Sequence, residues 1–241
     1  GHANAAEGDY SRAMGGLTTA EGDSSTSMGF FTTASGVAST AMGFGTIASG
    51  DFSTALGKGT IASGGCSTAM GYFTTAEDYM TLALGTLNKT DETPNPDNFS
   101  YQNTAFVIGN GGFNSDGVYD GNLSNAFEVL FDGTTTIAGD LNVNSDARLK
   151  ANIVSLGATL SKLLQIDGKS YTMKKDESEK QKIGLLAQDI EKVFPELVSE
   201  SHGVKSVNYQ GLVPVLINAL KEQQSEIDEL KTMLKTIIEK T

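Results

Sequence analysis

A repeat of 14 residues, which runs from residue 6 to residue 85 without a slip, constrains the fold most strongly. In each repeat a small residue is followed by Met or Leu and then Gly, and half a period later Ala-Ser-Gly or Ala-Glu-Gly recurs. Short runs of small and β-branched residues favour strands, and Gly favours turns because it adopts positive φ at little cost. Each repeat therefore predicts two short strands and two tight turns, which form one coil of a β-solenoid.

The Met and Leu positions predict how the coils stack. These positions are Met14, Met28, Met42, Leu56, Met70 and Leu84. Equal spacing places them along one line, which faces either the inside of the coil or a threefold axis between chains. The inward positions are expected to be mostly Ala, Thr and Met, so one copy buries little apolar surface and identical chains would have to cover its flanks. The strict period disfavours the alternative of a flexible low-complexity linker, because linkers show no phase.

The Ser-Thr-Ala-Met-Gly and Thr-Ala-Ser-Gly sequences resemble the head repeats of trimeric autotransporter adhesins. The resemblance covers about a third of the chain. It implies a left-handed β-roll in which three chains pack side by side, and therefore a homotrimer.

Composition narrows the possible partners. The chain has 241 residues and a formal net charge of −12, and an acidic surface repels nucleic acid and anionic membranes. No apolar run is long enough to span a bilayer, so neither nucleic-acid binding nor membrane insertion is expected. Cys66 is the only cysteine, which excludes an intrachain disulfide and a cysteine zinc site. Asp116 and Asp120 lack the spacing of a calcium loop, so no metal and no cofactor is expected.

Four domains are predicted: solenoid head repeats at 1–87, a linker and β-stalk at 88–144, a small α+β domain at 145–209 and a coiled-coil helix at 210–241. Residues 88–100 contain Pro94 and Pro96 among polar residues and break the repeat. Strands are expected at 104–108, 126–131 and 134–138, with a hairpin turn at Asp132-Gly133. The α+β domain is expected to hold helices at 156–166 and 187–194. Its strands are expected at 170–174, 182–186 and 206–209, with a charged turn at 175–180.

The final helix carries a heptad pattern from near Gln210, with Pro214 in its first turn. The seam positions are Val213, Leu216, Leu220, Gln223, Ile227, Leu230, Leu234 and Ile237. Leu with Ile at the two seam positions disfavours a dimer, and Gln223 would help to fix the register. The pattern predicts a trimeric coiled coil. An amphipathic helix that packs on its own domain is the alternative.

The segment Ser145-Asp146-Ala147-Arg148-Leu149-Lys150 marks the junction between the repetitive and the ordinary sequence. Ser145 and Lys150 could act as nucleophile and base, although from the residues alone a capping serine and a surface lysine are the default interpretation. Residues five apart point in different directions on a helix or strand, so the two meet only if the chain turns or if the lysine comes from a neighbouring chain. Arg148 is expected to place a positive charge near Lys150, which would favour its neutral form. With only two His, His2 and His202, a Ser-His-Asp triad is poorly supported.

Residues 145–241 resemble the C-terminal intramolecular chaperone domain of phage tail spikes and fibres, the endosialidase-type self-cleaving family. The matching segments are Ser-Asp-Ala-Arg-Leu-Lys, Asn152-Ile153, residues 183–188 and residues 193–198. The resemblance implies a foldase that assembles trimers and releases itself through a Ser145–Lys150 dyad, with cleavage at the Ser145–Asp146 bond.

Three functions remain to be compared. The first is a self-cleaving assembly chaperone on a trimeric surface or tail fibre, and the second is a structural adhesin or fibre fragment without cleavage. The third, a glycan-degrading spike, needs paired carboxylates across a groove, and the repeats hold no recurring acidic pair. A virion tail fibre or an extracellular surface is the expected location, with a host-surface receptor or glycan as a further partner.

Overall fold

The computed structural model describes residues 3–112, 120–174 and 179–240, and divides the chain into two compact units, Gly1–Val143 and Asn144–Thr241. Within the described residues, no helix has the length and apolar character that a membrane span requires. The expected charged turn at 175–180 lies largely outside the described residues.

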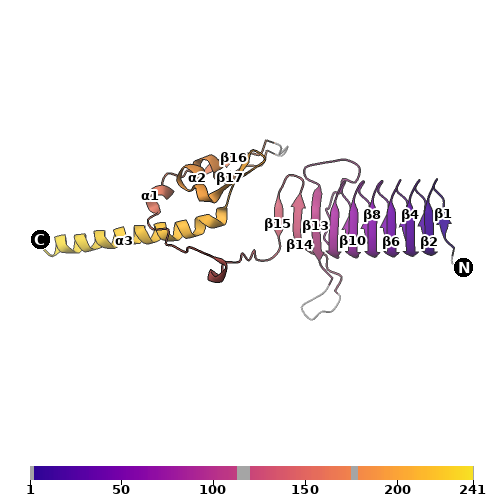
Figure 1. The fold of residues 1–241 in the computed structure, drawn as a ribbon, viewed down its shortest axis with the longest axis horizontal. Helices are drawn as coiled ribbons and strands as arrows, with labels where there is room; N and C mark the ends of the chain where they lie inside the picture. Colours follow the sequence, from indigo (N-terminus) through magenta and orange to yellow (C-terminus); the bar gives the residue numbers. More distant parts are fainter. Residues whose placement is uncertain (1–2, 113–119, 175–178, 241) are drawn as a thin grey trace. The chain divides into compact units, whose positions relative to one another are not determined.

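The first unit is a β-solenoid whose coils stack in parallel and in register, as the repeat predicts (Figure 1). One side is a sheet of two-residue strands: β1 Ala5–Ala6, β3 Thr19–Ala20, β5 Thr33–Ala34, β7 Ile47–Ala48, β9 Ile61–Ala62 and β11 Thr75–Ala76. The other side begins with five-residue strands: β2 Arg12–Gly16, β4 Thr26–Phe30, β6 Thr40–Phe44, β8 Thr54–Lys58, β10 Thr68–Tyr72 and β12 Leu82–Thr86. The prediction of two strands per coil is confirmed.

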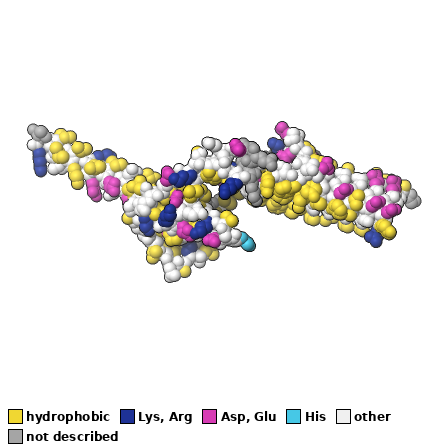
Figure 2. Space-filling view, turned by 90° about the horizontal axis from the view of Figure 1, so that it is seen from above, with side chains coloured by type: hydrophobic (Ala, Val, Ile, Leu, Met, Phe, Trp, Pro, Cys, Tyr) yellow, Lys and Arg dark blue, Asp and Glu magenta, His cyan; other side chains and the backbone are white. Residues whose placement is uncertain are grey.

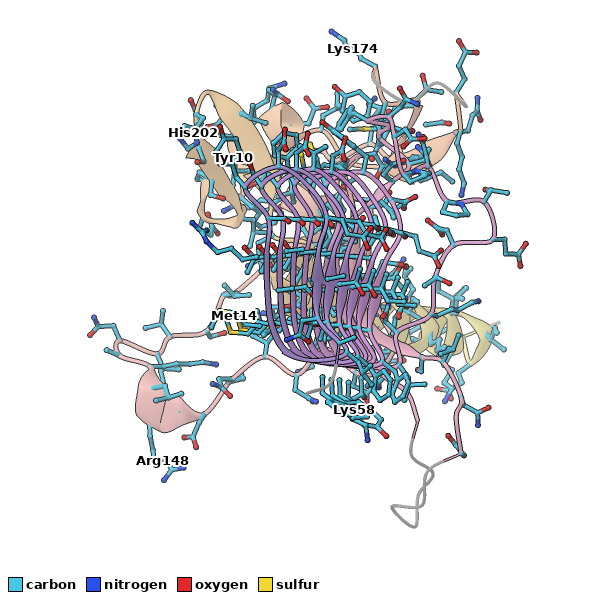
Figure 3. All side chains as sticks on the ribbon, turned by 90° about the vertical axis from the view of Figure 1, so that its right-hand side faces the viewer. Tyr10, Met14, Lys58, Arg148, Lys174 and His202 are labelled. Atoms are coloured by element: carbon cyan, nitrogen blue, oxygen red, sulfur yellow. The ribbon has the colours of Figure 1, made fainter. Side chains whose placement is uncertain are left out.

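The inside of the coil is filled by small residues. Alanines such as Ala41 and Ala48 have no exposed surface, and Thr46 and Ser39 between the strands are equally buried. Met14, Met28, Met42, Leu56, Met70 and Leu84 pair with one another in register, so they do lie along one line. That line faces outward: the Met14 side chain is 55% exposed, and Figure 3, viewed along the coils, places it on the outer surface. Of the two expected directions, the inside of the coil is therefore wrong, because neighbouring residues of a strand point to opposite faces and Ala takes the inward one. The other, a threefold axis between chains, stays a prediction.

The sheet that begins with the five-residue strands continues beyond the repeats and has nine strands. Strand β13, Thr104–Asn110, pairs in parallel with β12, so that Val107 lies opposite Ala83 and Gly109 opposite Gly85. The coil pattern thus resumes after an insertion at residues 88–103. Strands β14, Asn125–Leu130, and β15, Thr135–Ile137, follow as an antiparallel hairpin around Asp132-Gly133. The strands expected between 104 and 138 are confirmed, and they extend the solenoid sheet.

The second unit combines short elements with one long helix (Figure 1). Its elements are the 3₁₀-helix η1 Ala147–Leu149, α1 Leu160–Leu163, β16 Lys169–Tyr171, β17 Lys182–Gly184, α2 Ala187–Val193, η2 Pro195–Leu197, β18 Val198–Ser201, β19 Val204–Val207, η3 Tyr209–Gly211 and α3 Leu212–Ile238. Helix α1 is much shorter than the expected helix at 156–166. Strand β18, which no pattern indicated, pairs with β19 through a hairpin turn that contains His202. Ile190, Phe194 and Val215 form the small core of this unit.

Candidate functional site

The junction segment folds into a single tight turn around η1. Asp146 caps this 3₁₀-helix, because its Oδ1 accepts a hydrogen bond from the Arg148 backbone N at 2.8 Å. The backbone N of Leu149 donates to the Asp146 carbonyl, and that of Lys150 donates to the Ala147 carbonyl, each at 3.1 Å. The turn reverses the chain between Ser145 and Lys150, and the Lys150 Nζ donates to the Ser145 Oγ at 2.7 Å. The structure thus brings the two predicted residues together within one chain.

Arg148 binds Asp146 through a fork of hydrogen bonds. Its Nε lies 3.1 Å from Oδ1 and 3.0 Å from Oδ2, and its second terminal nitrogen lies 2.6 Å from Oδ2. The fork lowers the pKa of the Asp146 carboxyl and raises that of the Arg148 guanidinium. Arg148 extends into solvent from the turn in Figure 3. Its charge is therefore paired with Asp146, which helps to hold the turn, and the expected effect of Arg148 on Lys150 stays a prediction.

The whole segment is open to solvent in a single chain. Every residue from 133 to 158 is exposed, including Ser145 and Lys150. Several apolar side chains of this segment are exposed as well: Leu141, Val143, Leu149, Ile153, Val154 and Leu156. A lysine amine acts as a base only in its neutral form, which burial favours. A single chain brings the nucleophile and the base together but does not enclose them.

Helix α3 presents two different faces. Leu212, Val215 and Ala219 are buried on the face that packs on the rest of the second unit. On the same side, Glu222 accepts hydrogen bonds from the backbone N of Thr159 and Leu160, which caps the start of α1. The predicted seam occupies the remaining surface: Val213, Leu216, Leu220, Gln223, Ile227, Leu230, Leu234 and Ile237 are all exposed. The helix therefore docks on its own unit without using the heptad stripe, and the coiled coil stays a prediction.

Hydrophobic side chains also gather along one face of the solenoid (Figure 2). Phe30 and Phe44 stack with ring centroids 5.8 Å apart, and the Lys58 Nζ lies 5.9 Å from the Phe44 centroid and 5.2 Å from that of Tyr72. Figure 3 shows Lys58 at a corner of the coil, outside the backbone. These rings run beside the line of Met14 and its equivalents, so one side of the coil carries two adjacent apolar columns.

The structure also brings together four carboxylates that the sequence did not indicate as a group, those of Glu77, Asp78, Asp91 and Glu128. Asp78 is buried, and its two oxygens accept hydrogen bonds from the backbone N of Asn95 at 2.7 Å and of Thr104 at 3.0 Å, which fixes both ends of the insertion's second half. Burial, a hydrogen bond to Asp78 and the charges of Asp78, Glu128 and Glu77 raise the pKa of Asp91 to about 6. Glu77 and Asp78 are adjacent, but Asp91 and Glu128 lie in other segments of the sequence, so only the fold brings the four carboxylates together.

The other sequence candidates are not part of a composite site. His202 is exposed in the β18–β19 turn, where its Nδ1 lies 2.9 Å from the Ser201 Oγ, and Cys66 is exposed on the solenoid. Asp116 lies outside the described residues, and Asp120 accepts hydrogen bonds from Asn122. Within the part of the chain that the structure describes, no three His, Cys, Asp or Glu side chains are arranged as metal ligands.

Comparisons with known proteins match both halves of the chain. Residues 145–199 match the family described as chaperone of endosialidase, and residues 6–32 and 34–60 match two copies of the YadA head domain repeat. The long tail fiber protein Gp37 of Salmonella phage S16 is 32% identical over 146 residues, which is 53% of this chain and 19% of that protein. Gp37 of Enterobacteria phage M1 is 35% identical over 134 residues, 49% of this chain and 53% of that protein.

Gp37 of Enterobacteria phage Ox2 is 34% identical over 128 residues, which is 46% of this chain and 50% of that protein. The chain thus spans about half of the length of two of these relatives and a smaller part of the third. Its repeats form the β-solenoid, and its second unit begins with the turn that joins Ser145 to Lys150. The chain therefore combines YadA head domain repeats with a chaperone-of-endosialidase domain, and its homologues are long tail fibre proteins of phages.

Proposed function

We propose that this chain is a trimeric segment of a phage tail fibre, and that its C-terminal chaperone drives trimer assembly and then releases itself by Ser–Lys autoproteolysis. The tail-fibre relatives and the two matched families support the fibre and the chaperone. The 2.7 Å contact between the Lys150 Nζ and the Ser145 Oγ is the single observation that supports cleavage. The proposed partners are two further copies of the chain and a host-surface receptor or glycan.

The assembly role follows from the cost of pairing separate chains. The solenoid leaves its outer Met and Phe columns exposed, and closing them against other chains costs association entropy before any contact forms. A coiled coil that aligns three chains in register raises their effective concentration to about the millimolar range. Removal of the chaperone afterwards prevents simple reversal, so the assembled fibre becomes kinetically stable.

The cleavage chemistry assigns one role to each residue. Lys150 removes the proton from the Ser145 hydroxyl, and the resulting alkoxide attacks a carbonyl carbon. The cut is assigned to the Ser145–Asp146 bond. Leu149, Ile153 and Val154, which lie close to Lys150 in sequence, are apolar and exposed, and burial of this segment between chains would supply the dry environment that a lysine base needs. Cleavage would then follow assembly.

The test compares purified wild type with Ser145→Ala, Lys150→Ala and Lys150→Arg. We expect wild-type trimers to release a fragment of residues 146–241 at a rate that does not depend on protein concentration. The three variants should stay intact and trimeric, since an arginine does not give up its proton. Lys174→Ala, which changes an exposed lysine elsewhere in the same unit, serves as the control and should cut normally. Denaturing gels and intact mass measure the fragment.

Two outcomes would change the proposal. Normal cleavage by Lys150→Ala would show that the dyad is wrongly assigned. Wild-type trimers that never cut would support the second candidate, a structural fibre that keeps its chaperone as a permanent cap. The exposure of Ser145 and Lys150 in one chain is the observation that favours this candidate.

A further inference from the structure

The position of the assigned cut restricts which serine can make it. In the Ser145–Asp146 bond, the carbonyl carbon belongs to Ser145 itself. Attack by the same residue's Oγ would close a strained β-lactone ring made only of Oγ, Cβ, Cα and the carbonyl carbon. The short side chain also prevents the Oγ from approaching along the line that attack requires. A serine hydroxyl reaches the preceding carbonyl of its own chain more easily, but that reaction would break the Asn144–Ser145 bond instead.

We propose that the cut is made between copies: Ser145 of one copy attacks the carbonyl carbon of Ser145 in a neighbouring copy. The inference rests on the proposed function, and it adds that each chain is the substrate of another chain. The dyad itself is assembled within one chain, because the Lys150 Nζ and the Ser145 Oγ that form it belong to the same copy.

The exposure of the segment makes such an attack sterically feasible. Ser145 and Asp146 lie on the surface of their own chain, so a second chain can reach the bond between them. The turn stays formed meanwhile, because the fork between Asp146 and Arg148 and the capped η1 are internal to each copy. The exposed seam of α3 would bring the junctions of the three copies to the same level.

The reaction balances with water as the second reactant. The Lys150 amine takes the proton from the Ser145 hydroxyl, and the Oγ bonds to the neighbouring copy's Ser145 carbonyl carbon. The bond from this carbon to the Asp146 nitrogen breaks, and the proton passes from Lys150 to that nitrogen, which becomes the new amino terminus. Water, deprotonated by Lys150, then hydrolyses the ester between the two chains and restores the hydroxyl of the attacking serine.

Mixed trimers test the direction of attack. Full-length wild-type chains and Ser145→Ala chains, with different N-terminal affinity tags, are co-expressed, and trimers that carry both tags are isolated by two successive purifications. Intact mass then shows which chain has been shortened. If attack is between copies, Ser145→Ala chains are cut. In a trimer with a single Ser145→Ala chain, that chain cannot attack its neighbour, so the one chain left intact is wild type. If attack is within a chain, every Ser145→Ala chain stays intact and every wild-type chain is cut.

Two matched mixtures complete the test. A chain with both Ser145→Ala and Lys150→Ala should be cut by wild type as fully as the single variant, because a substrate chain supplies only its carbonyl. A mixture of Ser145→Ala with Lys150→Ala should not cut at all, since neither chain holds a complete dyad. Intact Ser145→Ala chains beside cut wild-type chains would overturn the inference, as would a fragment that begins at Ser145. Wild-type trimers without any cleavage would overturn the proposed function itself.

Discussion

At the scale of single residues, Asp146 shows how one side chain can organise the junction. Its Oδ1 caps η1, and its two oxygens hold the Arg148 guanidinium. Both contacts are exposed, so water strongly screens the ion pair, whereas the cap satisfies a backbone N–H of the turn whatever charge the side chain carries. The cap, rather than the charge, is therefore expected to keep the turn closed and Lys150 beside Ser145.

Replacement of Asp146 separates these two contributions. Asp146→Asn retains a capping oxygen, so release of the tail should slow by no more than about threefold. Asp146→Ala loses the cap, and the open turn should slow release by about fivefold or more. Arg148→Gln keeps the cap and should resemble Asp146→Asn. The rate is followed on denaturing gels, and an Asp146→Ala chain that cuts at the wild-type rate would contradict the role of the cap.

Asp91 should give the head a measurable pH dependence. Its pKa is raised to about 6 in the folded state, above the ordinary value of 3.8, so the folded state binds the proton more tightly than the unfolded state. The contribution to stability is therefore fully present below about pH 4 and is lost as the pH rises to about 6. Asp91→Asn, which keeps a hydrogen-bonding group beside Asp78, should melt at a higher temperature than wild type at pH 7 and show no such advantage at pH 4.

The Asp91 effect should be modest, because the carboxyl remains partly open to solvent. Thermal melts of wild type and variant across this pH range provide the measurement, and Asp97→Asn on the same insertion is the matched control. A constant difference in melting temperature between pH 4 and pH 7 would show that the carboxyl cluster does not retain its proton in the folded head.

At the scale of elements, glycines determine how closely the coils stack. Gly43 has a φ of +128°, and a Cβ built on it would lie 1.9 Å from the Gly57 carbonyl oxygen of the next coil. The neighbouring Gly45 also has positive φ, at +61°, but nothing lies within 4 Å of its Cβ position. Leu17, Phe31 and Phe73 occupy the equivalent corner in other coils and adopt the same left-handed backbone. Only the first of the two glycines is required by contact between coils.

The variants Gly43→Ala and Gly45→Ala test this difference within one coil. Gly43→Ala should destabilise the head by several kcal/mol or prevent folding, because the methyl group meets backbone that cannot move aside. Gly45→Ala should cost only about 1–2 kcal/mol, the usual cost of a left-handed non-glycine residue. Chemical denaturation of the two variants gives the comparison. Equal losses of stability would show that backbone conformation, and not close approach between coils, explains the glycine at position 43.

Much of the head could be predicted from the repeat, but the direction of its side chains could not. Hydrophobicity suggests that Met28 and its equivalents face inward, yet the narrow coil accepts only residues such as Ala41 and Ser27. The coil at β13 was also hidden, since an insertion separates it from the repeats and Val107 replaces the usual Ala. The contact between Ser145 and Lys150 depends on a capped turn of three residues, which spacing alone does not indicate.

At the scale of the whole molecule, the exposed surfaces of each unit indicate how copies would associate. The solenoid exposes its Met and Phe columns, and α3 exposes a complete heptad stripe with Leu220 and Leu234 more than half exposed. Exposed apolar surface of this extent is typical of protein interfaces. The use of the α3 stripe as a seam stays a prediction, and the sequence could not show that a separate face of the helix packs on the second unit.

A trimer should therefore depend on the stripe and not on the remaining surface of α3. Leu220→Asp with Ile227→Asp should convert trimers to monomers at micromolar concentration, because the seam would bury unpaired charges. Ser225→Asp with Thr232→Asp adds the same charge outside the stripe and should leave the trimer intact. Multi-angle light scattering gives the mass of each variant. Unchanged trimers in the first variant would place the assembly contacts elsewhere.

The in-register stacking of identical coils has a consequence for length. Each coil pairs with the next coil in the same register in which it pairs with the previous one, so the contacts do not depend on how many coils precede it. Gain or loss of one 14-residue unit would lengthen or shorten the head by roughly 4.8 Å and leave both ends unchanged. The copy number of the repeat then acts as a ruler, and duplication or recombination within the gene can adjust the reach of the fibre without redesigning any contact.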